Sequence, residues 1–541
     1  MLFNSYQFVF IFLPVALCGF ALLGRLSKPS TSLIWLTVAS IAFYAWWNPI
    51  NLLIIAPSVL LNYLLARVMI RCLDDRPGLA QALLIIGIFG NIAFLSYFKY
   101  TNFFREVSND LVGTDYVFTQ IVLPLGLSFI TFQKIGFLVD IYTTRVKSFS
   151  FQSYCLFVFF FPQLIAGPIV HYREMMPQFD HSSGRVSAED LTVGAGLFFF
   201  GLFKKVILAD GIAQHVAPIY ASAGAGEPVT LIYAWIATIG FTLQVYFDFS
   251  GYSEMALGAA RCFGIRLPMN FNSPLRATSI IDFWGRWHVS LVRFLTAYVF
   301  NPMAFALTSR RMEKNLPGLA GPQSSCGAFL SILALPTMVT MLLSGLWHGA
   351  GYGFVIWGLL HGSYLLINHA WNLYRPLFWP NNASHAKVMT PIGFILTFVA
   401  VVFAMAFFRS PTIGGGLAIA KGMMGGYGIS LPMAIGQQLG AWIPPGVVLV
   451  WTSGKSFVQA SAWLVCLLAV AWFLPNTLQI FARFTPALGF VATAGPDSPG
   501  RRSVMNINWK SSTAWAALSA VVAAIGILAL GQPTEFLYWQ F

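Results

Sequence analysis

The sequence predicts an all-α, polytopic transmembrane protein. Of its 541 residues, 57% are hydrophobic and only 9% are charged, whereas soluble domains contain about 45–50% apolar and about 25% charged residues. Long uncharged stretches recur along the whole chain, and aromatic residues, which suit lipid contact and membrane interfaces, make up 16% of it. A soluble fold cannot bury this much apolar surface, so we expect about eleven to thirteen membrane spans or re-entrant segments.

The candidate spans are the apolar stretches between the charged and polar segments. They lie near residues 6–24, 33–47, 51–66, 80–97, 118–140, 151–170, 191–208, 229–247, 329–347, 350–371, 391–408, 461–475 and 513–531. The first stretch lacks the basic segment and the small-residue cleavage site of a secretory signal peptide, so we expect it to be retained as a span.

Basic residues between the early spans predict the orientation of the chain. Arg25 and Lys28 follow the first candidate span, and Arg67, Arg71 and Arg76 follow the third. Since cytoplasmic loops are enriched in Lys and Arg, these residues place the amino terminus outside the cytoplasm. The same alternation predicts an external loop at 98–117.

The whole chain, 1–541, is predicted to form a single integral membrane domain, since no period of 20–50 residues repeats. We expect a catalytic core at 118–410. A glycine-rich, nearly uncharged segment at 411–445 begins a carboxy-terminal extension, 411–541, with one or two further spans.

Two segments inside the predicted core are too polar for ordinary spans. Residues 171–190 are polar, and residues 270–300 mix charged with aromatic side chains. Such segments are tolerated at membrane depth only where they are buried in protein or line a wet cavity. We therefore expect a functional site beside them.

Several classes of function are not supported. The formal charge of +13 comes from short basic clusters between apolar stretches, which do not form the continuous face of a nucleic-acid-binding protein. The six Cys are widely spaced without a CxxC pair, so neither a disulfide framework nor a metal site is predicted. No GxxxxGK[ST], GxSxG or HExxH motif is present.

His348 is the strongest candidate for a catalytic residue. It lies in LLSGLWHGAGYGFVIWGLLHG, with glycines on both sides. Small residues allow helices to pack closely in lipid, so one interpretation is a tight packing face that contains a histidine. The other is a proton acceptor, because an imidazole titrates near neutral pH and glycines leave room for a substrate. We expect His361 and His369 to be structural, with His361 on another face of a continuous helix.

Charged residues elsewhere in the core are further candidates. His288 lies in IIDFWGRWHVSL beside Asp282 and Arg286, where an Arg and Asp pair can simply fix a helix at an interface. Asp248, in QVYFDFSGYSEMALG, either shapes a polar cavity or is a hydrogen-bonded carboxylate in helix packing.

The same residues carry a resemblance to a known family. The motifs are FFPQLIAGPIVHYREMMPQF (160–179), YFDFSGYSEMALG (246–258), FWGRWHVSL (283–291) and LSGLWHGAGYGFVIWGLLHG (343–362). In this order they resemble the membrane-bound O-acyltransferase (MBOAT) family, and the branch that they resemble most is the membrane subunit of alginate O-acetylation. FYAWWNP (43–49), LPNTLQIF (474–481) and the closing PTEFLYWQF extend the resemblance over nearly the whole chain.

The resemblance implies an acyl-transfer site within the bilayer of a bacterial cytoplasmic (inner) membrane. His348 of the WHG motif is then the essential catalytic residue, and His288 of the RWH motif is the second. We expect Trp287, Trp347, Asp248 and Asp282 to line the substrate channel. Arg310, Arg311 and Lys314 are candidates for binding the donor's phosphates, if their loop is cytoplasmic.

The implied reaction passes acetyl groups across the membrane for O-acetylation of an extracytoplasmic polysaccharide. Acetyl-CoA is the expected donor, no bound cofactor is expected, and an extracytoplasmic acetyltransferase or acetyl-carrier protein is the expected partner besides membrane lipid. Alternatives are D-alanyl transfer to teichoic acid and a non-catalytic transporter or scaffold of polysaccharide secretion. A transporter with inverted repeats should show similarity between its halves, which the sequence lacks.

Overall fold

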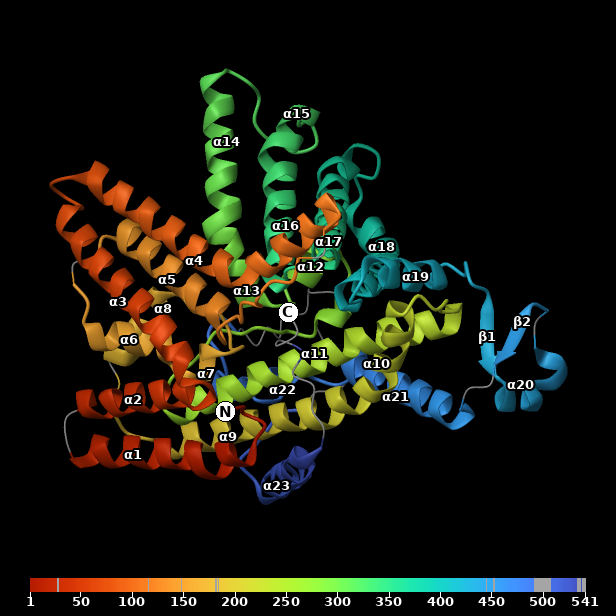
Figure 1. The fold of residues 1–541 in the computed structure, drawn as a ribbon, viewed down its shortest axis with the longest axis horizontal. Helices are drawn as coiled ribbons and strands as arrows, with labels where there is room; N and C mark the ends of the chain where they lie inside the picture. The colour runs from red at the N-terminus through yellow and green to blue at the C-terminus, as the bar shows by residue number, and fades with distance from the viewer. Residues whose placement is uncertain are drawn as a thin grey trace.

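The computed structural model describes residues 1–26, 29–114, 116–146, 148–180, 182, 184–443, 445–450, 453–490, 507–532 and 537. The described chain is almost entirely helical, as predicted (Figure 1). Its α-helices are α1 (Leu13–Leu26), α2 (Pro29–Trp47), α3 (Pro49–Cys72), α4 (Pro77–Val112), α5 (Leu127–Thr144), α6 (Phe151–Phe159), α7 (Phe161–Leu164), α8 (Tyr172–Asp180), α9 (Ala188–Phe203), α10 (Asp210–Gly224), α11 (Leu231–Cys262), α12 (Ile280–Trp284), α13 (Val289–Leu295), α14 (Asn301–Glu313), α15 (Cys326–Ala328), α16 (Leu335–His348), α17 (Tyr352–Tyr374), α18 (Asn382–Arg409), α19 (Ile413–Met423), α20 (Met433–Leu439), α21 (Gly454–Phe473), α22 (Thr477–Ile480) and α23 (Thr513–Leu528).

Ten helical stretches among the described residues are long and apolar enough to cross a membrane. They are Phe8–Leu26, Pro49–Cys72, Pro77–Val112, Ala188–Gly224, Leu231–Cys262, Val289–Glu313, Cys326–His348, Asn382–Arg409, Gly454–Phe473 and Thr513–Gly531. Helices α2, α5 and α17 cover three further predicted spans in whole or in part. The protein is therefore a multi-pass membrane protein.

The structure corrects three of the predicted segments. Residues 151–170 do not form one span, because α6 and α7 are short and separated by a break at Phe160. Residues 98–112 are not a loop but the second half of α4. The segment at 270–300, which mixes charges with aromatics, contributes its end to the candidate span Val289–Glu313.

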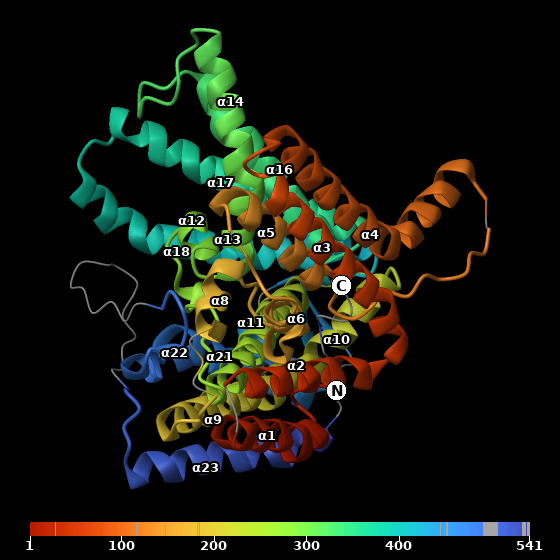
Figure 2. The ribbon, with the colours of Figure 1, turned by 90° about the vertical axis from the view of Figure 1, so that its left-hand side faces the viewer.

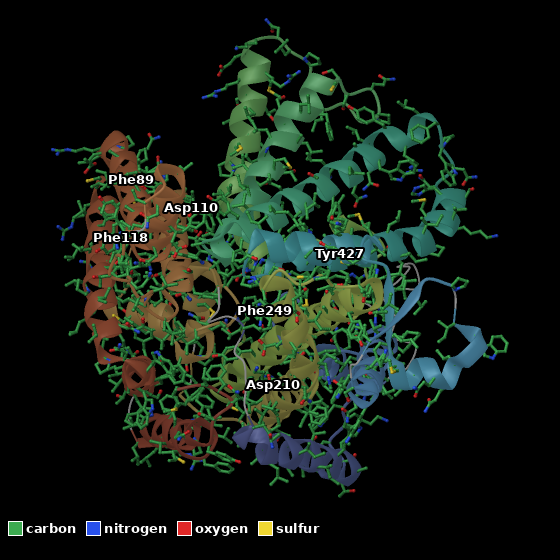
Figure 3. The ribbon with its side chains drawn as sticks, turned by 45° about the vertical axis from the view of Figure 1, so that its right-hand side comes forward. Phe89, Asp110, Phe118, Asp210, Phe249 and Tyr427 are labelled. Carbon is green, nitrogen blue, oxygen red and sulfur yellow. The ribbon has the colours of Figure 1, made fainter. Side chains whose placement is uncertain are left out.

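Helices α9 and α11 lie side by side (Figures 1 and 2). Glycines allow this contact, since a Cβ on Gly258 would lie 2.4 Å from the carbonyl oxygen of Gly194. About two helical turns further along α9, a Cβ on Gly201 would lie 2.5 Å from the carbonyl oxygen of Gly251. Small residues at such crossings bring helix backbones together in lipid. The centre of α11 is consequently buried, as Phe249 shows (Figure 3).

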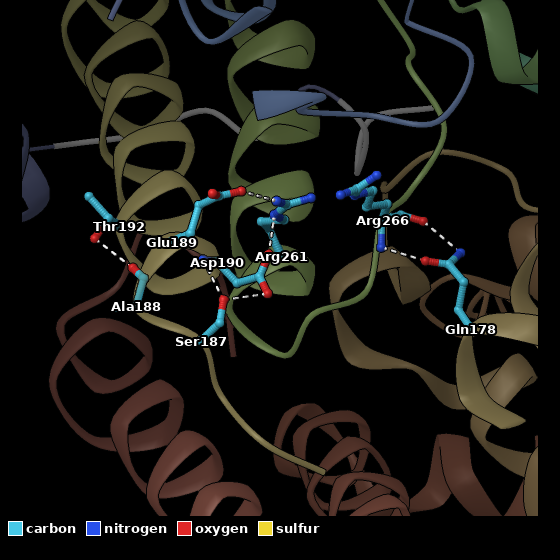
Figure 4. Close-up of polar contacts among 8 residues, drawn as sticks. All are labelled: Gln178, Ser187, Ala188, Glu189, Asp190, Thr192, Arg261 and Arg266. Atoms are coloured by element: carbon cyan, nitrogen blue, oxygen red, sulfur yellow. Dashed lines mark hydrogen bonds and ion pairs between the residues drawn. The ribbon is translucent and has the colours of Figure 1, made fainter. Parts of the chain in front are cut away.

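The ends of α9 and α11 are fastened by charged side chains (Figure 4). Arg261 near the end of α11 pairs with Asp190 at 2.6 Å and with Glu189 at 3.3 Å. Ser187 caps α9 by accepting a hydrogen bond from the Asp190 backbone N–H. These contacts hold the two helices at a fixed crossing, and α11 supplies Asp248 to the site described below.

The basic loops used to predict orientation are partly described. The Asp74 and Arg145 side chains form an exposed ion pair at 3.3 Å, so the end of α3 and the end of α5 lie on the same side of the bundle. Lys28 lies outside the described residues, and the side of the membrane remains a prediction.

The carboxy-terminal extension, for which one or two further spans were predicted, contains two helical stretches that are long and apolar enough to cross a membrane, Gly454–Phe473 (α21) and Thr513–Gly531 (α23 and its end). Between α19 and α21, strands β1 (Ile429–Pro432) and β2 (Val447–Val450) pair in parallel beside α20. The extension packs on the core, because α21 contacts α10 and α11 while α23 runs along α9. Of the closing PTEFLYWQF motif, only Leu537 falls within the described part of the chain.

Candidate active site

His348 is the last residue of α16 and is buried, with 7% of its surface exposed. Two side chains from α4 fix this helix end. Tyr100 donates a hydrogen bond to the Leu346 carbonyl at 2.8 Å, and Lys99 donates one to the Trp347 carbonyl. These carbonyls are among the last four of a helix, which have no partner within it. The segment predicted as an external loop is therefore what positions the candidate catalytic residue.

The chain turns sharply directly after His348, so the predicted continuous helix through His361 is wrong. Residues 349–351 separate α16 from α17. A Cβ on Gly349 would lie 2.1 Å from the ring of Phe354, and one on Gly345 would lie 2.3 Å from the Phe354 carbonyl oxygen. The glycines around His348 therefore bring α17 back against α16, and the packing interpretation of these glycines is correct for both positions.

The His348 side chain nevertheless lines a cavity. The cavity has a volume of about 20 Å³, which is enough for roughly one water molecule. Its lining residues are Val245, Asp248, Phe249, Trp287, His348, Trp357, Met405, Phe408 and Leu537. Three residues predicted from the sequence, Asp248, Trp287 and His348, therefore meet at one cavity, and Leu537 reaches it from the carboxy-terminal extension.

His288 lies next to His348, with 6.3 Å between the two ring centroids. It is fully buried and has a left-handed backbone conformation, with φ of 44°. Non-glycine residues seldom adopt this conformation, and it occurs preferentially at functional sites. The two histidines that the sequence singled out, 60 positions apart in the chain, thus form one buried pair.

Asn270 orients His288 and was not predicted from the sequence. Its Oδ1 lies 3.0 Å from His288 Nδ1 and also accepts a hydrogen bond from the Ser290 hydroxyl at 2.9 Å. Its amide nitrogen donates to the Ser253 hydroxyl at 3.2 Å. Because Oδ1 can only accept, Nδ1 carries the proton and Nε2 of a neutral His288 is left as an acceptor. The only signal in the sequence was that Asn270 is the first residue of the segment 270–300, which mixes charged with aromatic side chains.

Asp248 is joined to the protein by a buried ion pair. Its carboxylate lies 2.6 Å from Lys205 Nζ, which also contacts Asp210 at 2.7 Å. The neighbouring Lys204 makes a parallel ion pair with Glu254, also at 2.6 Å. Both pairs join the π-helical segment η2 (Lys204–Ala209) to α11, but of the two carboxylates only Asp248 lines the cavity with His348.

Trp347 and Asp282 are not lining residues of this cavity, although the Trp347 ring packs against those of His288 and His348, at centroid distances of 5.7 Å and 5.0 Å. Trp347 packs on Phe132 and Phe129, with centroid distances of 5.6 Å and 5.3 Å. Asp282 accepts a hydrogen bond from Arg286 at 2.7 Å, which is the interface pairing weighed above.

The predicted donor-binding residues Arg310, Arg311 and Lys314 lie at the far end of α14, and none lines the cavity. Arg311 holds the following loop by donating hydrogen bonds to the carbonyls of Pro317 and Gly327. Its observed contacts are therefore structural.

The fold and the site define a polytopic membrane protein with a pair of neighbouring buried histidines. Comparison with known proteins agrees with this class. The profile of the membrane-bound O-acyltransferase family, MBOAT, matches residues 138–312. The peptidoglycan O-acetyltransferase of Helicobacter pylori is 35% identical over 80% of this chain and 81% of its own.

Two further relatives define the range of the similarity. The probable alginate O-acetylase AlgI of Pseudomonas putida is 30% identical over the whole of both chains. The teichoic acid D-alanyltransferase of Bacillus subtilis is 27% identical over 52% of this chain and 68% of its own. The chain belongs to the membrane-bound O-acyltransferase family, and it is an acyltransferase.

Proposed function

We propose that this protein is an O-acetyltransferase of a bacterial inner membrane, which passes acetyl groups from acetyl-CoA in the cytoplasm towards an extracytoplasmic polysaccharide. The observation that carries the proposal is the buried His348 and His288 pair beside a cavity in an acyltransferase fold. Similarity over most of the chain to relatives named as O-acetyltransferase and O-acetylase supports acetyl transfer. The D-alanyl alternative has less support, because the D-alanyltransferases match about half of the chain.

The proposed reaction uses His348 as the general base. Its imidazole takes the proton from the accepting hydroxyl while that oxygen attacks the thioester carbonyl carbon. The tetrahedral oxyanion then collapses, the carbon–sulfur bond breaks, and the imidazolium returns the proton to the leaving thiolate. In this scheme His288 orients the reacting groups.

Asp248 provides a way to test the electrostatics of this scheme. A carboxylate across a small cavity from His348 stabilises the imidazolium that forms during transfer, so Asp248→Asn should lower kcat by about tenfold or more with little change in KM. The measurement is acetyl-CoA-dependent transfer by purified protein in proteoliposomes.

The matched control is Glu254→Gln, which removes the carboxylate of the parallel ion pair without touching the cavity. Both variants remove a carboxylate from a lysine of η2, although Lys205 keeps its ion pair with Asp210, so both are expected to lower thermal stability. Equal losses of kcat in the two variants would show that Asp248 acts only through the structure.

The proposed scheme also requires a partner. The described residues outside the candidate spans and outside α2, α5 and α17 form short helices, loops and a two-stranded sheet, which offer little surface for holding a long polysaccharide. We expect the purified protein by itself to cleave acetyl-CoA with water as the acetyl acceptor, but to acetylate polysaccharide only when an extracytoplasmic acetyltransferase or acetyl-carrier protein is added. Proteoliposomes with radiolabelled acetyl-CoA, assayed with and without that partner, measure both steps.

The control for this experiment is the His348→Ala variant with the partner present, which should give neither step. Efficient acetylation of polysaccharide by the protein alone would contradict the division of labour. If wild-type protein with the partner present neither cleaves acetyl-CoA nor acetylates polysaccharide, the result would instead support the scaffold alternative.

A further inference from the structure

A groove lies between two of the candidate membrane spans. Its walls are α13 and the π-helical segment η4 (Thr296–Phe300) from the span Val289–Glu313, α16 from the span Cys326–His348, and α17, which lies beside α16 (Figure 1). The groove has a volume of about 340 Å³, within the range of about 300–1,000 Å³ that is usual for ligand sites. None of its lining residues lines the His348 cavity.

The lining of the groove is apolar. Most of the lining side chains are aliphatic or aromatic, and none of the described lining residues is Asp, Glu, Lys or Arg. Two threonines of α16 also line it, but their hydroxyls are used within the helix. Thr337 donates to the Leu333 carbonyl at 2.7 Å, and Thr340 donates to the Pro336 carbonyl at 2.6 Å. An apolar cavity of this kind excludes water and takes an apolar ligand.

One end of the groove carries two unused hydrogen-bond donors. The Ser344 hydroxyl and the Trp284 indole N–H are buried, and neither has a hydrogen-bond partner among the described residues. Both residues line the groove. Buried donors without a partner are costly, so a ligand at this end should bring an acceptor oxygen.

The two ends of the groove lie at different depths of the candidate spans. In Cys326–His348, Ser344 lies near one end of the span and Thr337 lies near its middle. The distance between them along α16 is about 10 Å at a rise of about 1.5 Å per residue. One leaflet of a hydrocarbon core that is about 30 Å thick measures about 15 Å. The groove therefore extends from the donor end of one leaflet towards the middle of the bilayer.

We propose that this groove holds one acyl chain of a membrane phospholipid as a bound component of the protein. The chain fills the apolar part, and its ester carbonyl accepts hydrogen bonds at the end formed by Ser344 and Trp284, since a carbonyl oxygen has two lone pairs. Large apolar side chains are exposed on the same helices, such as Leu335 on α16 and Ile367 on α17. Lipid chains are the medium that surrounds such surfaces, so a phospholipid can reach the groove from the bilayer.

The position of the groove connects the bound chain to the candidate active site. Trp284, which lines the groove, packs on Trp357 of the His348 cavity at a centroid distance of 5.8 Å. Ser344 lies one helical turn before His348 on α16. The lipid site itself does not depend on acetyl transfer. Only the distinction between the bound chain and the transferred group rests on the proposed function, since an acetyl group would not fill the groove.

Photolabelling of the full-length protein in nanodiscs tests the proposal. The probe is a phosphatidylcholine with a diazirine on one acyl chain. The protein is extracted in detergent, washed to remove loosely held lipid, irradiated and mapped by mass spectrometry. We expect residues 291–300 and 337–344 to retain about tenfold more label than α3, whose exposed Leu53 and Leu61 represent the ordinary lipid-facing surface.

A groove-filling variant and a matched control locate the label. Val292→Trp places an indole in the groove and should lower the labelling of both groove segments by about tenfold. Leu343→Trp adds the same side chain to α16 at an exposed position that does not line the groove, so its labelling should stay within about twofold of wild type. If Val292→Trp fails to fold, Thr340→Trp fills the groove from α16 and decides in the same way.

Each outcome decides the proposal. Equal labelling of the groove segments and α3, or labelling that the groove-filling variant leaves unchanged, would overturn the site. Displacement of the label by pantetheine, and not by unlabelled phosphatidylcholine, would assign the groove to the arm of an acyl donor and overturn the lipid assignment. His348→Ala should retain the label, so loss of transfer and loss of this site are separable.

Discussion

Replacing His348 by Gln is expected to reduce acetyl transfer by about a thousandfold or more, while the protein remains in the membrane. The variant removes the proposed base but keeps a polar side chain of similar size beside the cavity. General bases contribute about 10²–10⁴-fold to rates, and a thousandfold loss corresponds to about 4 kcal/mol of transition-state stabilisation. The measurement is radiolabelled acetyl transfer from acetyl-CoA by purified protein in proteoliposomes.

The matched control for this prediction is His361→Gln. His361 is a buried histidine on α17 that packs among aromatic rings, with Trp357 at a centroid distance of 4.7 Å, and it does not line the cavity. Its loss should lower thermal stability and leave transfer within about tenfold of wild type. Transfer that survives in His348→Gln would remove the proposed mechanism, and loss of that variant from the membrane would assign His348 a structural role.

The sequence was sufficient for the fold class and for three of the nine residues that line the cavity. His348 is identified from its glycine-flanked position and Asp248 from a charge at the end of an apolar stretch, whereas His288 and Trp287 are identified from a segment that mixes charges with aromatics and from the family resemblance. Their proximity was not predictable from spacing, because it depends on how α11, α16 and residue 288 are brought together. A charged residue such as Asp248 within an apolar stretch predicts a polar partner nearby. That partner, Lys205, cannot be identified from the sequence, because the ion pair depends on how η2 packs against α11.

Features that depend on contacts distant in sequence were missed or misjudged. The sequence predicts a loop at 98–117, but residues 98–112 are helical. Lys99 and Tyr100 in this stretch donate hydrogen bonds to the end of α16, about 250 positions away. Asn270 has no pattern of its own, and its role comes from bonds to His288, Ser290 and Ser253. Leu537 reaches the cavity from the extension, which no local periodicity indicates.

Replacing His288 by Ala is expected to reduce transfer by about a hundredfold, which corresponds to about 2.7 kcal/mol of transition-state stabilisation. The expected loss is smaller than for His348 because the role proposed for His288 is to orient the reacting groups. Asn270→Ala should reduce transfer by a similar factor, because it removes the acceptor that fixes Nδ1 and the orientation of the ring.

The two residues should act as one unit in a double-mutant cycle. If Asn270 works through His288, the double variant should be no worse than His288→Ala alone, since the same function is lost once. Ser290→Ala is the control, because it removes another bond to Asn270 Oδ1 while keeping the bond between Asn270 and His288; its transfer should stay within about threefold of wild type. Losses from the two single variants that multiply in the double variant would show that Asn270 does not act by positioning His288.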